Sequence, residues 1–357
     1  MNEDTPYSFQ ERSHIELRAD TYTLPSPEMR KAMYNAEVGN DGFREDPTVN
    51  KLEEQCAELF NKESAVFVSS GIMGNFLSIL SHCERGDQII IGDQSHIYTN
   101  ELGGYASLGG VYPAVIKNEA NGTLDINSIM DELDPYEGSD EDIHLAQTKL
   151  IALENTHNSC GGKAIDNNYF SKVKSIASKK KIPIHLDGAR IFNACIALES
   201  SPSELTKHMD SVQFCLSKGL GAPVGSLVLG SENFTEKVRK WRKTIGGTTR
   251  QAGILAAAGI VGLKYYEESI KRDHDLAKYL EQKLSQINNV SVEPVQTNLV
   301  FFSINVNNPL EISIKLKEKG INGGNANNRW RFVPHYGLSK KDIDYVAKTI
   351  NELINNI

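Results

Sequence analysis

Short runs of apolar residues, each bounded by turn residues, recur along the first two thirds of the chain. They lie at residues 65–68, 88–91, 150–153, 182–186, 211–216 and 226–229. Segments with the apolar spacing of a helix, such as 73–83 and 169–180, separate many of these runs. Strands that are apolar throughout, rather than at alternate residues, are typical of a sheet covered by helices on both faces. The pattern predicts an α/β domain with a mostly parallel sheet over residues 21–250.

Two further segments carry helix signals. Asp46 and Pro47 form an N-cap followed by proline in the first turn. The apolar positions that follow share one helical face: Val49, Leu52, Cys56, Leu59 and Phe60. The uncharged segment 252–263 falls short of the roughly 20 apolar residues that a membrane span needs. We therefore expect a buried helix there and no membrane partner.

The pattern changes beyond residue 263. Strand-like runs lie at 290–293, 298–305 and 329–334, and a helix is predicted at 310–319. A last helix opens at Ser339, with Asp342 three residues later as in a capping box. We expect a linking helix and a smaller α+β domain with a mostly antiparallel sheet at residues 251–357. Residues 1–20 are expected to form a polar N-terminal arm.

Composition excludes several classes of protein. The chain has 357 residues, 39% of them hydrophobic, which suits a globular protein rather than a disordered or fibrous one. Thirty-eight basic residues against 46 acidic ones give a net charge of −8, which argues against nucleic acid as the main partner. The first residues show no secretory signal, and the five cysteines form no CxxC pair. Free thiols and a cytoplasmic location are expected.

Residues 69–75, Ser-Ser-Gly-Ile-Met-Gly-Asn, join the run at 65–68 to a helix. Backbone N–H groups at a helix N-terminus attract phosphate, so this segment is a candidate phosphate cradle. It lacks the lysine of a P-loop and the spacing of GxGxxG, which weakens an interpretation as a nucleotide site. A strand–helix turn without a ligand explains the segment equally well.

Residues 185–190, His-Leu-Asp-Gly-Ala-Arg, place Asp187 at the end of an apolar strand. A carboxylate is costly to leave unpaired beside a buried sheet. Asp187 is either a partnered N-cap or a carboxylate that keeps a heterocyclic nitrogen protonated. In the second interpretation, Arg190 offers a guanidinium fork for a substrate carboxylate.

Residues 217–225 place Lys218 directly after the run at 211–216, among small residues. A solvated surface cation is unusual in that setting, and glycines let another group approach the backbone closely. A partly desolvated lysine would have a lowered pKa and could act as an amine nucleophile toward an aldehyde.

Together the three segments fit one ligand, pyridoxal 5′-phosphate. Proteins that use this cofactor supply a phosphate cradle, a carboxylate for the pyridine nitrogen and a lysine that forms an aldimine with the cofactor aldehyde. Each signal is weak alone. Their order on successive strand ends makes the combination specific.

Two histidines also follow apolar strands, His96 after 88–91 and His157 after 150–153. A metal site built on this pair lacks a third ligand at recognisable spacing, so no metal is expected. The histidines without such a setting are interpreted as surface or helix residues: His14, His82, His144, His208 and His274.

Six short motifs resemble those of the low-specificity L-threonine (L-allo-threonine) aldolases. They are residues 17–21 (LRADT), 45–50 (EDPTVN), 154–158 (ENTHN), 185–190 (HLDGAR), 217–223 (SKGLGAP) and 250–253 (RQAG). The resemblance runs from about residue 15 to the last helix. It implies the aspartate-aminotransferase-like fold, called fold type I, and a homodimer or homotetramer with active sites between subunits.

The resemblance also implies a role for each site residue. Lys218 would carry pyridoxal phosphate as an aldimine, Asp187 would hold the pyridine nitrogen, and His96 would stack on the ring. Ser70, Gly71 and Ile72 would bind the phosphate together with Arg250 of a second subunit. Arg190 and Arg331 would bind the substrate carboxylate, and His157 would lie near the β-hydroxyl.

Five positions depart from the family pattern. The family usually has serine at Ala19, threonine at Ile72, tyrosine at Phe43, glycine at Arg44 and threonine at Pro334. Each lost hydroxyl removes a hydrogen bond worth about 0.5–1.5 kcal/mol. Backbone donors for the cofactor remain, so the departures bear on substrate preference.

The expected reaction is cleavage of the Cα–Cβ bond of threonine or allo-threonine to glycine and acetaldehyde. His157, or a water it positions, is expected to take the hydroxyl proton. A β-eliminating lyase or racemase acting on a related amino acid is the alternative. A nucleotide-binding oxidoreductase would need an acidic ribose ligand that the sequence lacks, and a non-catalytic relative would not need Lys218, Asp187 and Arg190 together.

Overall fold

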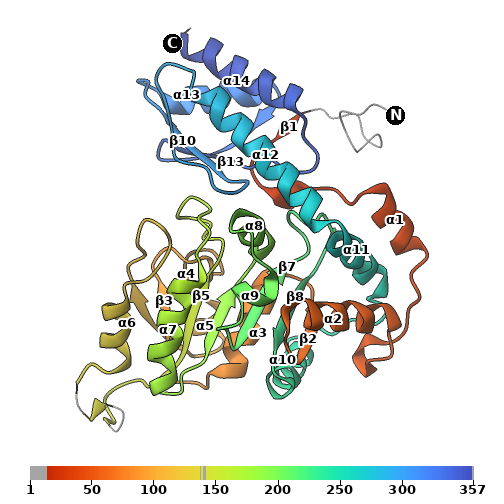
Figure 1. The fold of residues 1–357 in the computed structure, drawn as a ribbon, viewed down its shortest axis with the longest axis vertical. Helices are drawn as coiled ribbons and strands as arrows, with labels where there is room; N and C mark the ends of the chain where they lie inside the picture. The colour runs from red at the N-terminus through yellow and green to blue at the C-terminus, as the bar shows by residue number, and fades with distance from the viewer. Residues whose placement is uncertain (1–13, 137, 140–141, 356–357) are drawn as a thin grey trace.

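The structure, a computed structural model, describes residues 14–136, 138–139 and 142–355. Figure 1 shows a large α/β part and a smaller part, with the long helix α12 (Tyr266–Leu284) running from the smaller part toward α11 (Gly253–Lys264). Most of the expected N-terminal arm, residues 1–13, lies outside the described residues.

The large part is built on a seven-stranded sheet in the order β2-β8-β7-β6-β5-β3-β4. All neighbouring strands in it are parallel except the pairs that β8 makes with β2 and β7. The strands are β2 (Ser64–Val68), β3 (Gln88–Gly92), β4 (Tyr112–Ile116), β5 (Thr148–Glu154), β6 (Ile184–Asp187), β7 (Ser211–Cys215) and β8 (Ser226–Gly230). The prediction of a mostly parallel sheet is confirmed. β4 was not predicted, because this edge strand carries exposed residues between buried ones.

Helices cover this sheet. α3 (Gly71–His82) packs on β6, β7 and β8 and on α10 (Glu232–Thr244), while α2 (Pro47–Phe60) packs on β2, β8 and α11. Asp46 caps α2 as expected, accepting a hydrogen bond from Val49 N at 3.0 Å. The others are α1 (Pro27–Tyr34), α4 (His96–Thr99), α5 (Gly104–Ser107), α6 (Ile126–Leu133), α7 (Asn167–Lys179), α8 (Ile191–Ala197) and α9 (Pro202–Leu205).

The small part has a four-stranded antiparallel sheet in the order β12-β13-β10-β9. Its elements are β9 (Val290–Val292), β10 (Val300–Ile304), α13 (Pro309–Glu318), β11 (Ile321–Asn322), β12 (Gly324–Ala326), β13 (Arg329–Phe332) and α14 (Lys340–Asn355). Ser339 N donates to the Asp342 carboxylate at 2.8 Å, so the expected cap of the last helix is present. The strand β1 (Ile15–Glu16) pairs in parallel with β11. The first described residues therefore belong to the small part, although they precede the large part in the sequence.

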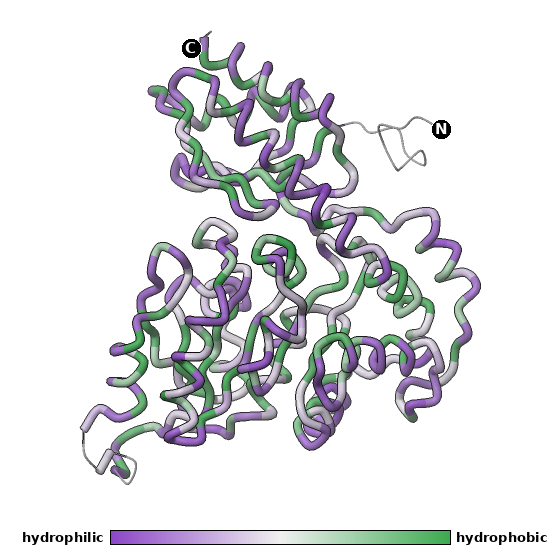
Figure 2. The backbone as a smooth tube through the Cα atoms, in the orientation of Figure 1, coloured by the Kyte–Doolittle hydropathy of each residue, from purple (hydrophilic) through white to green (hydrophobic). Residues whose placement is uncertain are grey.

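Apolar residues follow the buried elements. Figure 2 shows a largely apolar α11, which matches the buried helix predicted at 252–263. All five cysteines are free and buried. Within the described part of the chain, no helix has both the length and the apolar character that crossing a bilayer requires.

Candidate active site

Several of the expected site residues follow strands at the carboxyl edge of the large sheet. Glu154 ends β5 and Asp187 ends β6, and these two residues are paired in the register of the parallel strands. Lys218 follows β7 after two residues, and α3 begins after Ser70, at the end of β2. Open α/β sheets bind ligands at this edge.

Asp187 is buried, and both its carboxylate oxygens accept hydrogen bonds. Oδ1 accepts from the backbone N of Ala189 at 3.0 Å, and Oδ2 accepts from Asn75 Nδ2 at 2.9 Å. The second bond comes from α3, which carries Asn75, whereas the first comes from the loop that directly follows Asp187. Asp187 is therefore a partnered carboxylate held in place for a further contact.

His96 lies beside Asp187 and is held by Glu101. The imidazole Nδ1 is 2.8 Å from Glu101 Oε1, and Asn75 Nδ2 donates to the same oxygen at 2.9 Å. The hydrogen bond to Glu101 raises the pKa of His96, against the opposing effects of burial and of the Lys218 charge. Burial raises the pKa of Glu101. Ligand atoms of His96, Glu101 and Asp187 lie within 4.8 Å of one another, but Asn75 already bridges the two carboxylates.

Lys218 is half-buried, and within the described residues its amine makes no hydrogen bond or ion pair. Its charge acts on both sides of the site. Burial tends to raise the pKa of Asp20, but Arg190, and more weakly Lys218, hold it well below the ordinary value. The Lys218 charge thus acts on both Asp20 and His96, although its amine has no fixed partner within the described residues.

Two guanidinium groups point at one oxygen on the other side of the site. Arg190 Nη1 donates to Asn158 Oδ1 at 3.3 Å, and Arg331 Nη1 donates to the same atom at 3.1 Å. Arg190 is buried and fixed by two 2.7 Å hydrogen bonds from Nε and Nη2 to Asp20. The pair forms an anion site that Asn158 occupies with a neutral oxygen.

Glu154 connects the two halves of this site. Its Oε2 accepts from the backbone N of His96 at 2.6 Å, and its Oε1 accepts from the backbone N of Asn158 at 2.8 Å. One buried carboxylate therefore sets the positions of the imidazole and of the loop that faces the two arginines.

The start of α3 has the form expected of a phosphate cradle. Ser70 caps the helix by accepting from Met73 N at 3.2 Å. A Cβ on Gly71 would lie 2.8 Å from Cys215 Sγ, so only glycine lets the helix begin this close to the sheet. Ile72 is exposed beside it.

Two expected residues have other surroundings. His157 is 1% exposed, with Nε2 3.2 Å from Asn118 Nδ2 and Nδ1 4.0 Å from Glu154 Oε1, so its ring is enclosed by protein. Arg250 is exposed near Gly42, where a glycine Cβ would come within 2.9 Å of its Nη1. That Arg250 serves a second subunit stays a prediction.

The donor set at this edge fits pyridoxal phosphate. An amine without a partner suits the aldehyde, a partnered carboxylate suits a protonated ring nitrogen, and a helix N-terminus suits the phosphate. An imidazole beside the carboxylate suits the face of the ring. The residues present therefore match the cofactor inferred from the sequence.

Five contributors to the site were not assigned from the sequence: Asn75, Glu101, Asp20, Glu154 and Asn158. Four of them lie inside motifs, Asn75 at 69–75, Asp20 at 17–21, and Glu154 and Asn158 at 154–158. The motifs could have marked these residues as site candidates, but the hydrogen bonds that they make are visible only in the folded chain. Glu101 follows the short helix α4, and nothing in its local sequence marks it.

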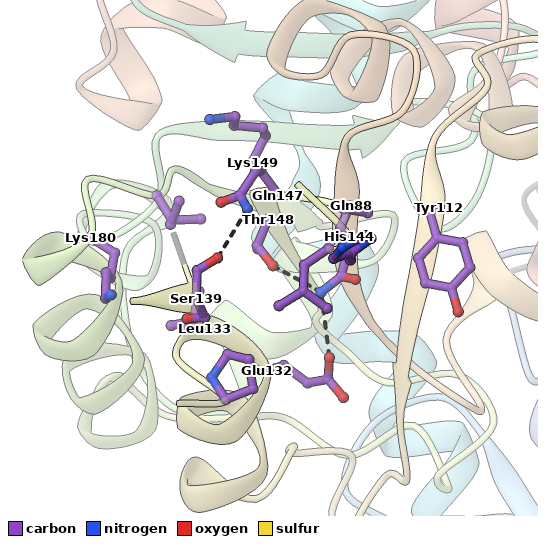
Figure 3. A pocket seen from close by; sticks show the side chains of 14 residues that line it. Gln88, Tyr112, Glu132, Leu133, Ser139, His144, Gln147, Thr148, Lys149 and Lys180 are labelled. Carbon is purple, nitrogen blue, oxygen red and sulfur yellow. Dashed lines mark hydrogen bonds between the residues drawn. The ribbon is translucent and has the colours of Figure 1, made fainter. Parts of the chain in front are cut away.

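A large cavity of about 690 Å³ lies elsewhere, at the amino edge of the sheet (Figure 3). Gln88 and Thr148, at the starts of β3 and β5, line it and are joined by a 3.0 Å hydrogen bond. None of the expected site residues lines this cavity. We therefore assign the site to the carboxyl edge.

The departures from the family pattern have distinct settings. Arg44 has φ 61° in the left-handed region, which explains why glycine is usual there. Its side chain forms an ion pair with Glu236. Phe43 is 73% exposed and Ile72 48% exposed, so both positions are open to solvent in the single chain.

Comparison with known proteins places the chain in a family. Residues 16–307 match the beta-eliminating lyase family. The chain is 43% identical over 346 residues to low-specificity L-threonine aldolase 1 of Arabidopsis thaliana, covering 95% of this chain and 96% of that protein. It is 40% identical over 333 residues to the low specificity L-threonine aldolase of Escherichia coli strain K12, covering 93% and 97%.

A solved structure agrees with the fold. The threonine aldolase of Leishmania major superposes with a TM-score of 0.80 over 95% of this chain and 99% of that one, at 16% sequence identity. Together with the mixed, mostly parallel sheet, this confirms fold type I. The chain belongs to the beta-eliminating lyase family and, within it, to the low-specificity L-threonine aldolases.

Proposed function

We propose that this protein is a pyridoxal-phosphate-dependent aldolase that cleaves L-threonine and L-allo-threonine to glycine and acetaldehyde. The observation that carries the proposal is the set formed by Asp187, His96 and a Lys218 amine without a partner, facing two arginines that share one oxygen. The names of the relatives support the choice of substrate.

The cofactor would be held at four points. Lys218 Nζ would bond covalently to its aldehyde carbon, Asp187 would bind the ring nitrogen, and His96 would lie on the ring face. The N–H groups of Gly71 and Ile72, with Ser70, would bind the phosphate. When bound, pyridoxal phosphate takes up the substrate amine and accepts the electron pair of the broken Cα–Cβ bond.

Asp187 would keep the ring nitrogen protonated by placing a carboxylate against it, and the two hydrogen bonds it accepts hold that carboxylate in position. A protonated ring accepts electrons more readily than a neutral one. This is the chain's electrostatic contribution to the bond-breaking step.

Arg190 and Arg331 would bind the substrate carboxylate. Asn158 Oδ1 now accepts from both guanidinium groups, and a carboxylate would replace this neutral acceptor with two charged oxygens. The Asp20 ion pair fixes two of the nitrogens of Arg190, so its remaining nitrogen is held ready for the substrate.

The hydroxyl proton needs an acceptor beside the substrate. His96 is better placed than His157, because its Nδ1 bonds to Glu101 and this contact makes the imidazole more basic. His157 is enclosed between Asn118 and Gly122. We therefore propose His96 as the proton acceptor and His157 as a residue that positions the loop of Asn158.

A second copy of the chain would complete the site with its Arg250, which is exposed near Gly42. We propose a homodimer as the smallest active assembly, with a homotetramer as two such pairs. The five free thiols suit a reducing compartment, and we propose a cytoplasmic location.

Product analysis tests the proposed reaction. Purified protein supplied with pyridoxal phosphate is incubated separately with L-threonine, L-allo-threonine and D-threonine. Equal amounts of glycine and acetaldehyde from the L-isomers support the proposal. A keto acid and ammonia would show a β-eliminating lyase, and an isomer without cleavage would show a racemase. Either outcome would contradict it.

A further inference from the structure

A chain of buried hydrogen bonds leads from Asp187 away from the site. His185 and Asp187 are two residues apart on β6, so their side chains lie on the same side of the sheet. Ser211 on β7 is the register partner of His185. Asn75 and His82 lie seven residues apart on α3, two turns along one face of that helix.

The contacts along this chain are continuous. Asn75 Oδ1 is 3.1 Å from His185 Nε2, and His185 Nδ1 is 2.9 Å from Ser211 Oγ. Ser211 Oγ is in turn 2.8 Å from His82 Nε2. His185 and Ser211 are fully buried, and Asn75 is 1% exposed.

The donors fix the direction of every bond. Asn75 Nδ2 faces two carboxylates, Asp187 and Glu101, so both its hydrogens are donated there and Oδ1 must accept. His185 Nε2 therefore carries the proton. His185 Nδ1 then accepts from the Ser211 hydroxyl, which accepts in turn from His82 Nε2.

The charge states agree with this direction. Burial lowers the pKa of His185 to about 4 and that of His82 to about 3, so both rings are neutral near neutral pH. A neutral imidazole has one donor and one acceptor, as the chain of bonds requires.

We propose that His185 is a positioning residue that locks the Asn75 carboxamide in the orientation that donates to Asp187. A reversed amide would place Oδ1 against two carboxylates and its N–H₂ group against the Nε2 proton of His185. The lock thus keeps an N–H donor on Asp187 Oδ2 and would hold that carboxylate in place against a protonated ring nitrogen. This last step rests on the proposed function.

A matched pair of variants tests the proposal. A glutamine amide nitrogen can replace Nε2 of histidine, whereas the shorter asparagine amide reaches only the position of Nδ1. We expect His185→Gln to keep the wild-type affinity for pyridoxal phosphate. We expect His185→Asn to weaken it about tenfold, as loss of a hydrogen bond supporting a charged group would.

The ¹⁵N chemical shift of the pyridine nitrogen gives a readout independent of turnover. With labelled cofactor, we expect a protonated nitrogen in the wild type and His185→Gln, and a shift toward the unprotonated value in His185→Asn. Ser81→Ala is the control, because within the described part of the chain that buried hydroxyl of α3 bonds only to Leu77 O, at 2.7 Å, and its loss should change neither readout. Equal shifts and affinities in all four proteins would overturn the proposal.

The tautomer of His185 can be measured without any variant. Solid-state NMR of cofactor-free protein with ¹⁵N-labelled histidine should show His185 protonated at Nε2, and protonation at Nδ1 would overturn the proposal even if the variants fail to fold. If the wild type binds no pyridoxal phosphate, the proposed function fails while this measurement still decides the orientation.

Discussion

At the residue scale, the buried histidines make stability depend on pH. Burial lowers the pKa of His185 to about 4, whereas an unfolded chain binds this proton near about pH 6.5. Between these values the unfolded chain holds more protons than the folded one, so the free energy of unfolding falls as the pH is lowered through this window. Above it, both states are neutral and the effect vanishes.

His185→Gln removes this titration. Between about pH 6.5 and 4, we expect the free energy of unfolding of the variant to fall less steeply than that of the wild type. The difference accumulated over this range should be about 1.4 kcal/mol for each unit of pKa shift that the substitution removes. Urea denaturation across this range measures both slopes. His144→Gln, at an exposed histidine, is the control. Parallel curves for wild type and His185→Gln would contradict the linkage.

Single residues were predictable where chemistry and position coincide. Lys218 and Asp187 stand at strand ends in unusual settings, so the sequence alone suggests their roles. Asn75 and Glu101 were not assigned, because an amide that bridges two carboxylates becomes visible only when α3 is laid across the strand ends. His157 contacts Asn118, which lies 39 residues earlier in the chain, so its surroundings could not be predicted from its motif.

At the scale of elements, Asp46 accepts hydrogen bonds from three segments: the start of α2, the start of α11 and the loop at Gly39. Its carboxylate caps α2 through Val49 N, and it also accepts from Gly253 N at 2.9 Å and Gly39 N at 3.1 Å. Asp46 is fully buried, so its loss would leave these donors without partners.

We expect Asp46→Ala to lower the free energy of unfolding by about 2–4 kcal/mol, since it removes a helix cap and leaves two further backbone donors unsatisfied. Ser231→Ala, which removes only the cap of α10, should cost about 1 kcal/mol. Urea denaturation compares the two. A cost for Asp46→Ala no larger than that for Ser231→Ala would show that the contacts to Gly39 and Gly253 contribute nothing.

Elements were predictable where burial is complete. The inner strands β3, β5, β6, β7 and β8 are apolar runs in the sequence and buried in the fold. The edge strand β4 mixes exposed and buried residues around Pro113, so its sequence resembles a loop. β1 has two residues, and only its pairing with β11 makes it a strand.

At the scale of the whole molecule, a site shared between subunits predicts complementation. Lys218→Ala and Arg250→Ala should each be inactive alone. In a hybrid dimer one site carries both replacements and the other carries neither. Mixing equal amounts under conditions of subunit exchange should restore about one quarter of wild-type activity, because half the dimers are hybrids with one intact site.

Activity of the separated and remixed proteins measures this prediction. The blank is Lys218→Ala alone, taken through the same subunit-exchange treatment. It should stay inactive. No recovery in a mixture shown to contain hybrid dimers would mean that Arg250 serves its own chain.

The account depends most on the bond between Lys218 and the cofactor. Wild-type protein and Lys218→Ala are loaded with pyridoxal phosphate, reduced with borohydride and digested, and the peptides are weighed by mass spectrometry. We expect the mass of reduced pyridoxal phosphate on the peptide that contains Lys218 in the wild type, and on no peptide of the variant. A modified lysine elsewhere, or none in the wild type, would contradict the central claim.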